Sequence, residues 1–330
     1  MRSPSLGFGV IALAAYHPPE QLFARQLLSI QAQTHGDFHC LISVDGDYHR
    51  VAAAVQHICG DDDRFKVIGF DNRLGFYGNF ERVLAAVPAH AQWIALSDQD
   101  DYWYPEKLAT LIPHLAHYSL VSGQARVVNE SGQVLVAQTR RRQAELVDLF
   151  SENQVTGSLS VLRADLLPLA LPFPKLNTPA QYHDHWLGVC AGAARGFTVV
   201  DEIVQDYIQH VNNVVGENRT GLRHLISRVK LLARTYEGSA SPAALVRFLS
   251  TAGIGWRSLM ADTVAARGPE PSPELDKAMR TYSSGAPRSA AARAIVRGLR
   301  LGAVPPRRAL ELMVSLGASV FTGRKGDSQP

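Results

Sequence analysis

Three aspartates follow a short apolar segment in the first half of the chain. Asp98, Asp100 and Asp101 come directly after residues 93–96, and no basic residue intervenes before Lys107. The apolar segment predicts a buried strand of a parallel sheet, and ligands bind at the carboxyl ends of such strands. Closely spaced carboxylates at that position could hold a divalent cation. The alternative is a solvated turn in which one of the aspartates caps the next helix.

The elements that must position these carboxylates alternate regularly along the chain. Apolar segments predict strands, and apolar residues at helical spacing predict the helices between them. This repeated pattern predicts an α/β fold with a doubly wound, mainly parallel sheet flanked by helices. Two later strands flank a turn of Asn, Glu, Ser and Gly and predict a hairpin. The expected strands are residues 8–15, 38–44, 65–70, 93–97, 120–128 and 133–138, and the expected helices are 20–33, 51–58 and 76–87.

Composition places the chain among large globular proteins. With 330 residues and 46% hydrophobic content, it can bury a large core. Cys40, Cys59 and Cys190 are odd in number and form no C-x-x-C pair, which argues against a disulfide framework or a zinc site and fits a reducing cytoplasm. The sequence has neither a run of 18 apolar residues nor a signal-like start, so we expect neither membrane spanning nor secretion.

Charge is distributed unevenly along the chain. Residues 1–218 carry 15 Lys and Arg against 23 Asp and Glu, whereas residues 219–330 carry 18 against 7. We therefore expect an acidic, active domain over residues 1–220 and a basic, mostly helical region over residues 221–330. A basic region suits an anionic surface or partner, and the alternative is a solvated helical tail without a partner. The helices expected there begin near residue 222 and cover 290–301 and 307–321.

A series of motifs resembles the family 2 glycosyltransferases, and more narrowly their bacterial rhamnosyltransferase-like members. The motifs are S-I-Q-A-Q-T at 29–34, D-G-D at 45–47, N-R-L-G-F-Y-G-N-F-E-R at 72–82, S-D-Q-D-D-Y-W-Y-P-E-K-L at 97–108, Y-H-D-H-W-L at 182–187 and Y-I-Q-H-V-N-N-V-V-G at 207–216. Their order and approximate spacing match those of the family. The resemblance covers about residues 8–216 and implies a GT-A, Rossmann-like catalytic domain followed by a C-terminal helical extension.

The resemblance implies transfer of a sugar from a nucleoside-diphosphate donor, with Mg²⁺ or Mn²⁺ at the diphosphate. Oxygen ligands suit these cations, which act as Lewis acids. By this resemblance Asp100 is the metal carboxylate, Asp98 lies near the ribose or the metal, and His210 contacts the metal or the diphosphate. Asp101 is expected to orient the loop or cap the next helix. For His210 the alternative is a surface histidine after a short strand.

Three further residues are assigned to the donor by resemblance. Asp45 is expected to accept a hydrogen bond from the pyrimidine ring, and Asn79 to take part in donor binding. Gly157 belongs to a small-residue loop that resembles the one near the donor diphosphate, where the backbone must approach closely. An ordinary turn is the alternative explanation for Asp45 and for Gly157.

The acceptor hydroxyl must lose a proton as it attacks the anomeric carbon, and the resemblance assigns the role of general base to Asp184. Asp184 precedes residues 186–194, which predict a helix whose N-terminus would favour an ionised carboxylate; the same position suits a helix cap. With one base and no evident nucleophile, we expect inversion. His183 and His185 flank Asp184, but side chains two residues apart face different sides of a helix, which disfavours a shared metal site.

Together, the motifs and the resemblance predict a metal-dependent inverting glycosyltransferase. Its donor would be a dTDP- or UDP-sugar, with dTDP-rhamnose as one candidate, and its acceptor a glycan or a lipid-linked molecule in cell-surface polysaccharide synthesis. The expected location is the cytoplasm, at the inner face of the cell membrane, without a nucleic-acid partner. Two alternatives remain: a nucleotidyltransferase acting on sugar phosphates, and a non-catalytic sugar-nucleotide-binding protein.

Overall fold

The computed structural model describes residues 7–209 and 222–322 and divides the chain into two compact units. One unit, called the sheet unit below, is drawn from Met1–Gln143, Val155–Pro172 and Ala194–Gly216. The other, called the helical unit, is drawn from Ala144–Gln154, Phe173–Ala193 and Glu217–Pro330. The helical unit therefore combines the C-terminal region with two segments from earlier in the chain. The domain division expected at residue 220 stays a prediction.

The described strands of the sheet unit form one nine-stranded sheet in the order β3-β2-β1-β4-β8-β6-β9-β5, with β7 beside β6. Four strands, β1 to β4, pair in parallel at one end of this order. They are β1 (Gly9–Ala15), β2 (Phe38–Asp45), β3 (Phe65–Phe70) and β4 (Trp93–Ser97). The others are β5 (Tyr102–Trp103), β6 (Leu120–Asn129), β7 (Val134–Val136), β8 (Ser160–Arg163) and β9 (Phe197–Gln209).

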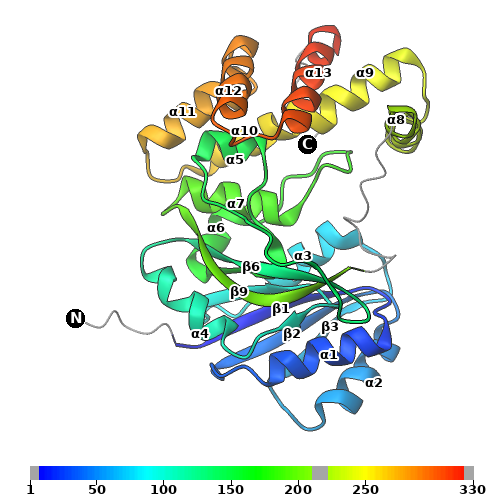
Figure 1. The fold of residues 1–330 in the computed structure, drawn as a ribbon, viewed down its shortest axis with the longest axis vertical. Helices are drawn as coiled ribbons and strands as arrows, with labels where there is room; N and C mark the ends of the chain where they lie inside the picture. Colours follow the sequence, from blue (N-terminus) through cyan, green and yellow to red (C-terminus); the bar gives the residue numbers. More distant parts are fainter. Residues whose placement is uncertain (1–6, 210–221, 323–330) are drawn as a thin grey trace. The chain divides into compact units, whose positions relative to one another are not determined.

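Helices connect the parallel strands and cover the sheet. Figure 1 shows α1 (Glu20–Gln31) and α2 (Tyr48–Cys59) on one face of the parallel strands and α3 (Gly75–Ala85) on the other. This arrangement confirms the predicted α/β fold with a mainly parallel sheet flanked by helices. The remaining helical segments of this unit are α4 (Lys107–Leu111), η1 (Ile112–Ala116), η2 (Gly157–Leu159), η3 (Ala164–Leu166) and α6 (Leu167–Ala170).

The central strands of the sheet unit are buried because helices cover both faces. All five residues of β4 are buried, as are six of the seven residues of β1. Such strands carry apolar side chains on both faces, which is why they appear in the sequence as continuous apolar runs. At the start of β1, a Cβ on Gly9 would stand 2.0 Å from the Trp93 ring. Glycine at this position allows the indole to pack against the backbone of β1.

The second half of the sheet was only partly predicted. The expected hairpin is confirmed, because β6 and β7 pair antiparallel. The sequence did not predict β8, which lies antiparallel between β4 and β6, or β9, which runs parallel to β6. Of these, β8 has four residues, and most of β9 is only partly buried and mixes polar with apolar side chains. Neither strand therefore has the apolar run that revealed β1 to β4.

The helical unit contains α5 (Leu146–Ser151), α7 (His183–Ala193), α8 (Leu222–Glu237), α9 (Pro242–Ser250), a π-helical segment (Thr251–Gly255), α10 (Trp256–Arg267), α11 (Pro273–Tyr282), α12 (Arg288–Arg300) and α13 (Pro306–Thr322). Local signals set several helix ends. Ser241 and Ser272 cap α9 and α11, each followed by proline, and Gly268 ends α10 at φ +60°. No helix within the described ranges combines the length and hydrophobicity that crossing a bilayer requires.

Candidate functional site

The carboxyl ends of β1, β2 and β4 meet at one edge of the sheet unit. The sheet register pairs Ala15 with Val44, and Leu13 with Ser97. Asp45 ends β2, and the loop that contains the other aspartates follows Ser97 directly. Because ligands of open α/β sheets bind beyond the carboxyl ends of their strands, this edge is the candidate site.

The loop after β4 presents two of its three carboxylates. Asp98 and Asp100 are partly exposed, whereas Asp101 is fully buried. Between them, Gln99 fastens the loop to the end of β1: its Oε1 accepts the N–H of Tyr16 at 2.7 Å, and its Nε2 donates to the carbonyl of Tyr16 at 3.1 Å. The paired bonds fix the loop backbone relative to the neighbouring strand.

The donor set of this loop fits a hard divalent cation. Mg²⁺ and similar ions bind through one or two protein carboxylates together with phosphate oxygens of a substrate. Asp98 and Asp100 supply two such carboxylates on an accessible loop. Across residues 7–209 and 222–322, no three Cys, His, Asp or Glu side chains form a complete metal site by themselves. Further ligands would come from a substrate or from His210, which lies outside the described residues.

Asp101 takes part in a buried polar network. Its Oδ2 accepts from Nε2 of Gln205 at 2.8 Å. Gln205 also donates to Oγ of Ser158 at 3.0 Å and accepts from Nζ of Lys107 at 2.6 Å. Lys107 donates to the carbonyl of Ser158 as well, and its Nζ lies 3.6 Å from the centre of the Trp103 ring. The network joins the aspartate loop to the start of α4, to η2 and to β9.

Burial changes both ionisable groups of this network. Burial, and then repulsion from Asp100, raises the pKa of Asp101 to about 7. Burial also lowers the pKa of Lys107 well below its usual range, although attraction to Asp101 opposes this shift. The residue at the N-cap position of α4 is Glu106, so Asp101 orients the loop and does not cap the helix.

Gly157 opens η2 and is buried. The next residue, Ser158, receives hydrogen bonds from both Gln205 and Lys107. In the same segment, Oγ of Ser160 donates to the carbonyl of Thr156 at 2.7 Å. The structure therefore connects the Gly157 segment to the aspartate loop through the buried network.

Asp45 is nearly fully buried and holds the loop that enters α3. Its two carboxylate oxygens accept the backbone N–H groups of Leu74 at 2.5 Å and Gly75 at 2.8 Å. Backbone N–H groups at a helix start need such acceptors. The adjacent Arg73 places its guanidinium 4.4 Å from the centre of the Tyr16 ring. A contact of Asp45 with a pyrimidine ring stays a prediction, and the structure adds this role in holding the loop.

Asn79 is buried, and its amide is used within the protein. Its Oδ1 accepts from Oγ of Ser43 and from Arg82, both at 2.7 Å. Its Nδ2 donates to the carbonyls of Ser43 at 2.9 Å and Ala15 at 3.4 Å. An amide offers two donors and two acceptor positions, and all four are occupied here. Asn79 thus ties α3 to β1 and β2, and any part in donor binding stays a prediction.

Asp184 lies in the helical unit, in the first turn of α7. Its Oδ1 accepts the backbone N–H of His185 at 2.7 Å and Nδ2 of Asn153 at 3.0 Å. The side chain is partly exposed. Both donors bind the same carboxylate oxygen and hold it at the start of α7. The role of Asp184 as a general base stays a prediction.

The two histidines beside Asp184 are buried and neutral. Burial lowers the pKa of His183 to about 4, although Asp184 opposes the shift, and burial lowers the pKa of His185 well below its usual range. Nε2 of His185 lies 2.9 Å from the carbonyl of Leu149 and must carry the proton, because a carbonyl only accepts. The ring of His185 is therefore directed to the backbone of α5.

The sequence did not single out Gln99, Lys107, Gln205 or Asn153 as parts of the site. Each acts by holding an aspartate or its loop. Only Lys107 carried a usable signal, because Leu111 follows it by four residues, on the same face of a helix, and indicates that this face is buried. The partners of the three amides depend on tertiary pairings that no local pattern reveals.

Known proteins resemble this chain in both sequence and fold. Residues 11–165 match the model of glycosyl transferase family 2. An uncharacterized glycosyltransferase of Methanocaldococcus jannaschii is 21% identical over 202 residues, which cover 60% of this chain and 69% of that protein. The structure of S. aureus TarS 1-349 in complex with UDP-GlcNAc matches with a TM-score of 0.53 and 15% identity, over 96% of this chain and 92% of that chain. This likeness confirms the predicted GT-A-like fold.

Proposed function

We propose a reaction for this chain from the premise that residues 11–165 form a family 2 glycosyltransferase domain and that the chain is a glycosyltransferase. In the proposed reaction, a sugar moves from a dTDP- or UDP-sugar to an acceptor hydroxyl with inversion of configuration at the anomeric carbon. One observation carries the proposal: Asp98 and Asp100 are accessible on a loop fastened to the carboxyl edge of a parallel sheet. The matched domain contains this loop, together with Asp45, Asn79 and Gly157.

In this proposal Asp100, with Asp98, holds Mg²⁺ or Mn²⁺, and His210 adds a contact to the metal or the diphosphate. A bound divalent cation would neutralise the negative charge of the leaving diphosphate. The chain's own residues prepare the site: Gln99 fixes the loop to the end of β1, and the buried Asp101 anchors it to Gln205 of β9. Asp45 is proposed to face the base of the nucleotide.

Asp184 is the proposed general base. It takes the proton of the acceptor hydroxyl while the acceptor oxygen bonds to the anomeric carbon. The bond from that carbon to the diphosphate oxygen breaks in the same step, and its electron pair leaves with the nucleoside diphosphate. A single displacement of this kind inverts the anomeric configuration.

The donor and the acceptor are proposed from a structural relative, from the motifs and from the charge distribution. The structural relative with UDP-GlcNAc supports a uridine donor, and the rhamnosyltransferase-like motifs support dTDP-rhamnose. The proposed acceptor is a glycan or a lipid-linked molecule in cell-surface polysaccharide synthesis. The excess of Lys and Arg after residue 218 supports peripheral association with an anionic membrane, at the inner face of the cell membrane.

A thermal-shift screen of nucleotide sugars with Mn²⁺ tests the donor. A donor present at a hundred times its Kd stabilises the folded state by about 2.7 kcal/mol and raises the Tm. We expect dTDP- or UDP-sugars to raise the Tm only with the metal, and turnover to release a nucleoside diphosphate. Release of pyrophosphate would identify a nucleotidyltransferase instead, and binding without any turnover across acceptors would identify a non-catalytic binding protein.

A further inference from the structure

The outward side of α13 carries a stripe of exposed apolar side chains. Leu310, Met313, Val314, Val320 and Phe321 are all exposed, Phe321 by 83%. Their spacing places them along one side of the helix, while the other side is buried within the helical unit. On α12, Val296 and Leu299 are exposed in the same manner. Soluble helices rarely keep such a stripe in water without a use for it.

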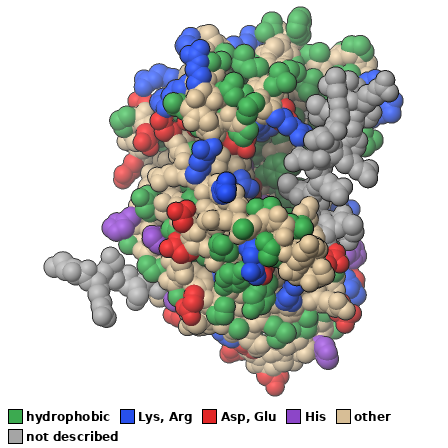
Figure 2. Space-filling view, in the orientation of Figure 1, with side chains coloured by type: hydrophobic (Ala, Val, Ile, Leu, Met, Phe, Trp, Pro, Cys, Tyr) green, Lys and Arg blue, Asp and Glu red, His purple; other side chains and the backbone are tan. Residues whose placement is uncertain are grey.

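The apolar stripe lies among arginines. Residues 288–322 contain six arginines and one glutamate, and four of these arginines, Arg288, Arg297, Arg307 and Arg308, contact other residues of the protein. Arg293 and Arg300 lie within one turn of Val296 on α12, and Figure 2 shows hydrophobic and basic side chains close together over the helices of this unit. An apolar side bordered by arginines is the pattern of helices that lie in the interface of an anionic bilayer. A second copy of this chain would bring the same positive surface against itself.

We propose that the outward side of α12 and α13 docks on an anionic lipid surface, with the seven exposed apolar side chains entering the interface and Arg293 and Arg300 contacting lipid headgroups. The surface gives the membrane association of the proposed function a physical location. It does not depend on the reaction, because lipid binding can be measured without any substrate.

Flotation of the full chain with vesicles tests this surface. We expect binding to vesicles of phosphatidylcholine mixed with phosphatidylglycerol, little binding to phosphatidylcholine alone, and weaker binding at high salt. Removing two apolar contacts in the double variant Leu310→Gln/Val314→Gln should weaken binding by about 10-fold or more. Leu231→Gln on α8 is the matched control, because Leu231 is 61% exposed, close to the 66% of Leu310, and lies outside the proposed surface.

Two results would refute the proposal that this surface binds lipid. One is equal vesicle binding by the double variant and the wild type. The other is no binding to the anionic vesicles by a wild-type chain that instead forms dimers in sedimentation. A donor-induced Tm shift that is unchanged in the double variant would separate a failure of this surface from a failure of the proposed reaction.

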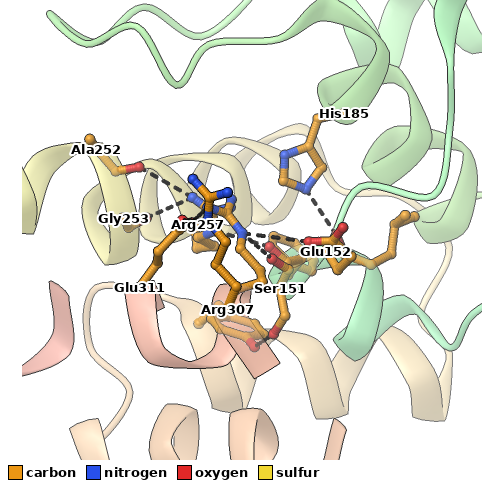
Figure 3. Close-up of polar contacts among 12 residues, drawn as sticks. Ser151, Glu152, His185, Ala252, Gly253, Arg257, Arg307 and Glu311 are labelled. Carbon is orange, nitrogen blue, oxygen red and sulfur yellow. Dashed lines mark hydrogen bonds and ion pairs between the residues drawn. The ribbon is translucent and has the colours of Figure 1, made fainter. Parts of the chain in front are cut away.

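A different set of contacts concerns the end of α5. Its last three carbonyls, from Leu149, Phe150 and Ser151, each accept a hydrogen bond from a different helix. Figure 3 labels three of the residues involved: Ser151, His185 and Arg257. The donors are Nε2 of His185 on α7 at 2.9 Å, Nε of Arg257 on α10 at 3.0 Å and Nε of Arg308 on α13 at 3.2 Å. The last carbonyls of a helix need such partners, so three helices hold this helix end.

The two arginines at the end of α5 are themselves held firmly. Arg257 is 1% exposed, and its guanidinium also donates to the carbonyls of Ala252 at 3.3 Å and Gly253 at 3.0 Å. Burial lowers its pKa well below the usual range. Arg308 lies 3.6 Å from Oε2 of Glu152 and 3.0 Å from Oε2 of Glu311. These contacts fix the backbone immediately before Asn153.

Asn153 reaches from this fixed segment to Asp184. Its Nδ2 donates to Oδ1 of Asp184 at 3.0 Å, the same oxygen that accepts the N–H of His185. His185 thus contacts both Asp184, through its backbone, and α5, through its ring. Two donors on one oxygen fix the orientation of the carboxylate plane.

We infer that Asn153 is a positioning residue for Asp184, held in place by the α5 end and its arginines. The inference rests on the proposed function, in which Asp184 is the base. It makes the C-terminal helices α10 and α13 part of the support of the catalytic carboxylate.

Substitutions at Asn153 test this role. Asn153→Ala should lower kcat by about 10- to 100-fold, the usual value of a hydrogen bond to a charged group, and leave the KM for the donor unchanged. Asn153→Asp should place a second carboxylate beside Asp184 and move the acidic limb of the kcat–pH profile to higher pH. Asn177→Ala is the matched control, because Nδ2 of this asparagine, in the same unit, donates to a backbone carbonyl, that of Tyr236, at 2.8 Å.

The positioning role fails if both Asn153 variants keep the wild-type kcat and pH profile. It also fails if Asn153→Ala lowers Tm and donor affinity together with kcat, since that indicates a general structural role. Asp184→Asn separates the two proposals: if this variant retains full turnover, the assignment of the base is wrong, whereas loss of turnover with normal Asn153 variants refutes the positioning role alone.

Discussion

The two carboxylate regions of the molecule are built in different ways. At the sheet edge, Asp98 and Asp100 lie on a loop set by the end of β4, and its main anchor, Gln99, contacts the adjacent strand. In the helical unit, Asp184 is oriented by Asn153, whose segment is held by Arg257 and Arg308 from more than 100 residues further along the chain. At the sheet edge, topology brings the strand ends together and Gln99 then fixes the loop, whereas in the helical unit the orientation of Asp184 depends on side chains from several helices.

The strongest test of this difference is the loss of the proposed base, Asp184. Asp184→Asn should lower turnover by roughly 10² to 10⁴, the usual contribution of a general base, and retain donor binding because the sheet edge is untouched. Steady-state kinetics measures the turnover, and titration of the donor into the same variant measures donor binding. Unchanged turnover would remove Asp184 from its role.

The buried network beneath the aspartate loop should matter mostly for stability. Lys107→Met removes the donor of two buried hydrogen bonds, to the Ser158 carbonyl and to Gln205, which should lower the free energy of unfolding by about 2 to 6 kcal/mol, at about 1 to 3 kcal/mol for each acceptor left unpaired. Chemical denaturation measures this loss. A single variant within about 1 kcal/mol of wild type would show that the network contributes little.

The helical unit should be the more sensitive to acid. The folded-state pKa of His183 is lowered to about 4, below its unfolded value of 6.5. Its contribution to the free energy of unfolding is therefore complete above pH 6.5 and is lost as the pH falls toward 4. The full loss from this group is about 3 kcal/mol. Denaturation curves between pH 7.5 and 4.5 measure it, and His183→Gln should show a shallower pH dependence. An identical pH dependence in the variant would contradict the assignment.

The anchor of the aspartate loop should have the smallest effect. Gln99→Ala removes two hydrogen bonds to Tyr16 at a partly exposed site, which should weaken binding of Mn²⁺ with UDP by about fivefold and leave Tm nearly unchanged. Calorimetric titration measures the affinity. Gln92→Ala is a control, since Gln92 accepts a backbone N–H from Gly7 at the opposite end of the neighbouring strand. Equal affinities for both variants would indicate that the loop holds its geometry without Gln99.

The sequence predicted the parts of the fold that have strong local patterns. Strands β1 to β4 are apolar runs, so their bounds and the sheet edge that carries Asp98 and Asp100 followed directly from the sequence. The short β8 and the mixed β9 lacked this signal. The roles of Gln205 and Asn153 could not be predicted, because an amide has no preferred partner until tertiary contacts choose one. Asn79 shows the converse: its motif was recognisable, but its complete internal bonding was visible only in the structure.

The central claim is that the sheet edge binds the metal–diphosphate group while Asp184 serves only the chemical step. Calorimetric titration of UDP in the presence of Mn²⁺ into wild type, Asp100→Ala and Asp184→Asn tests it most directly. We predict normal affinity for Asp184→Asn and a loss of metal-dependent affinity for Asp100→Ala. Normal affinity for Asp100→Ala, or equal losses for both variants, would contradict the claim.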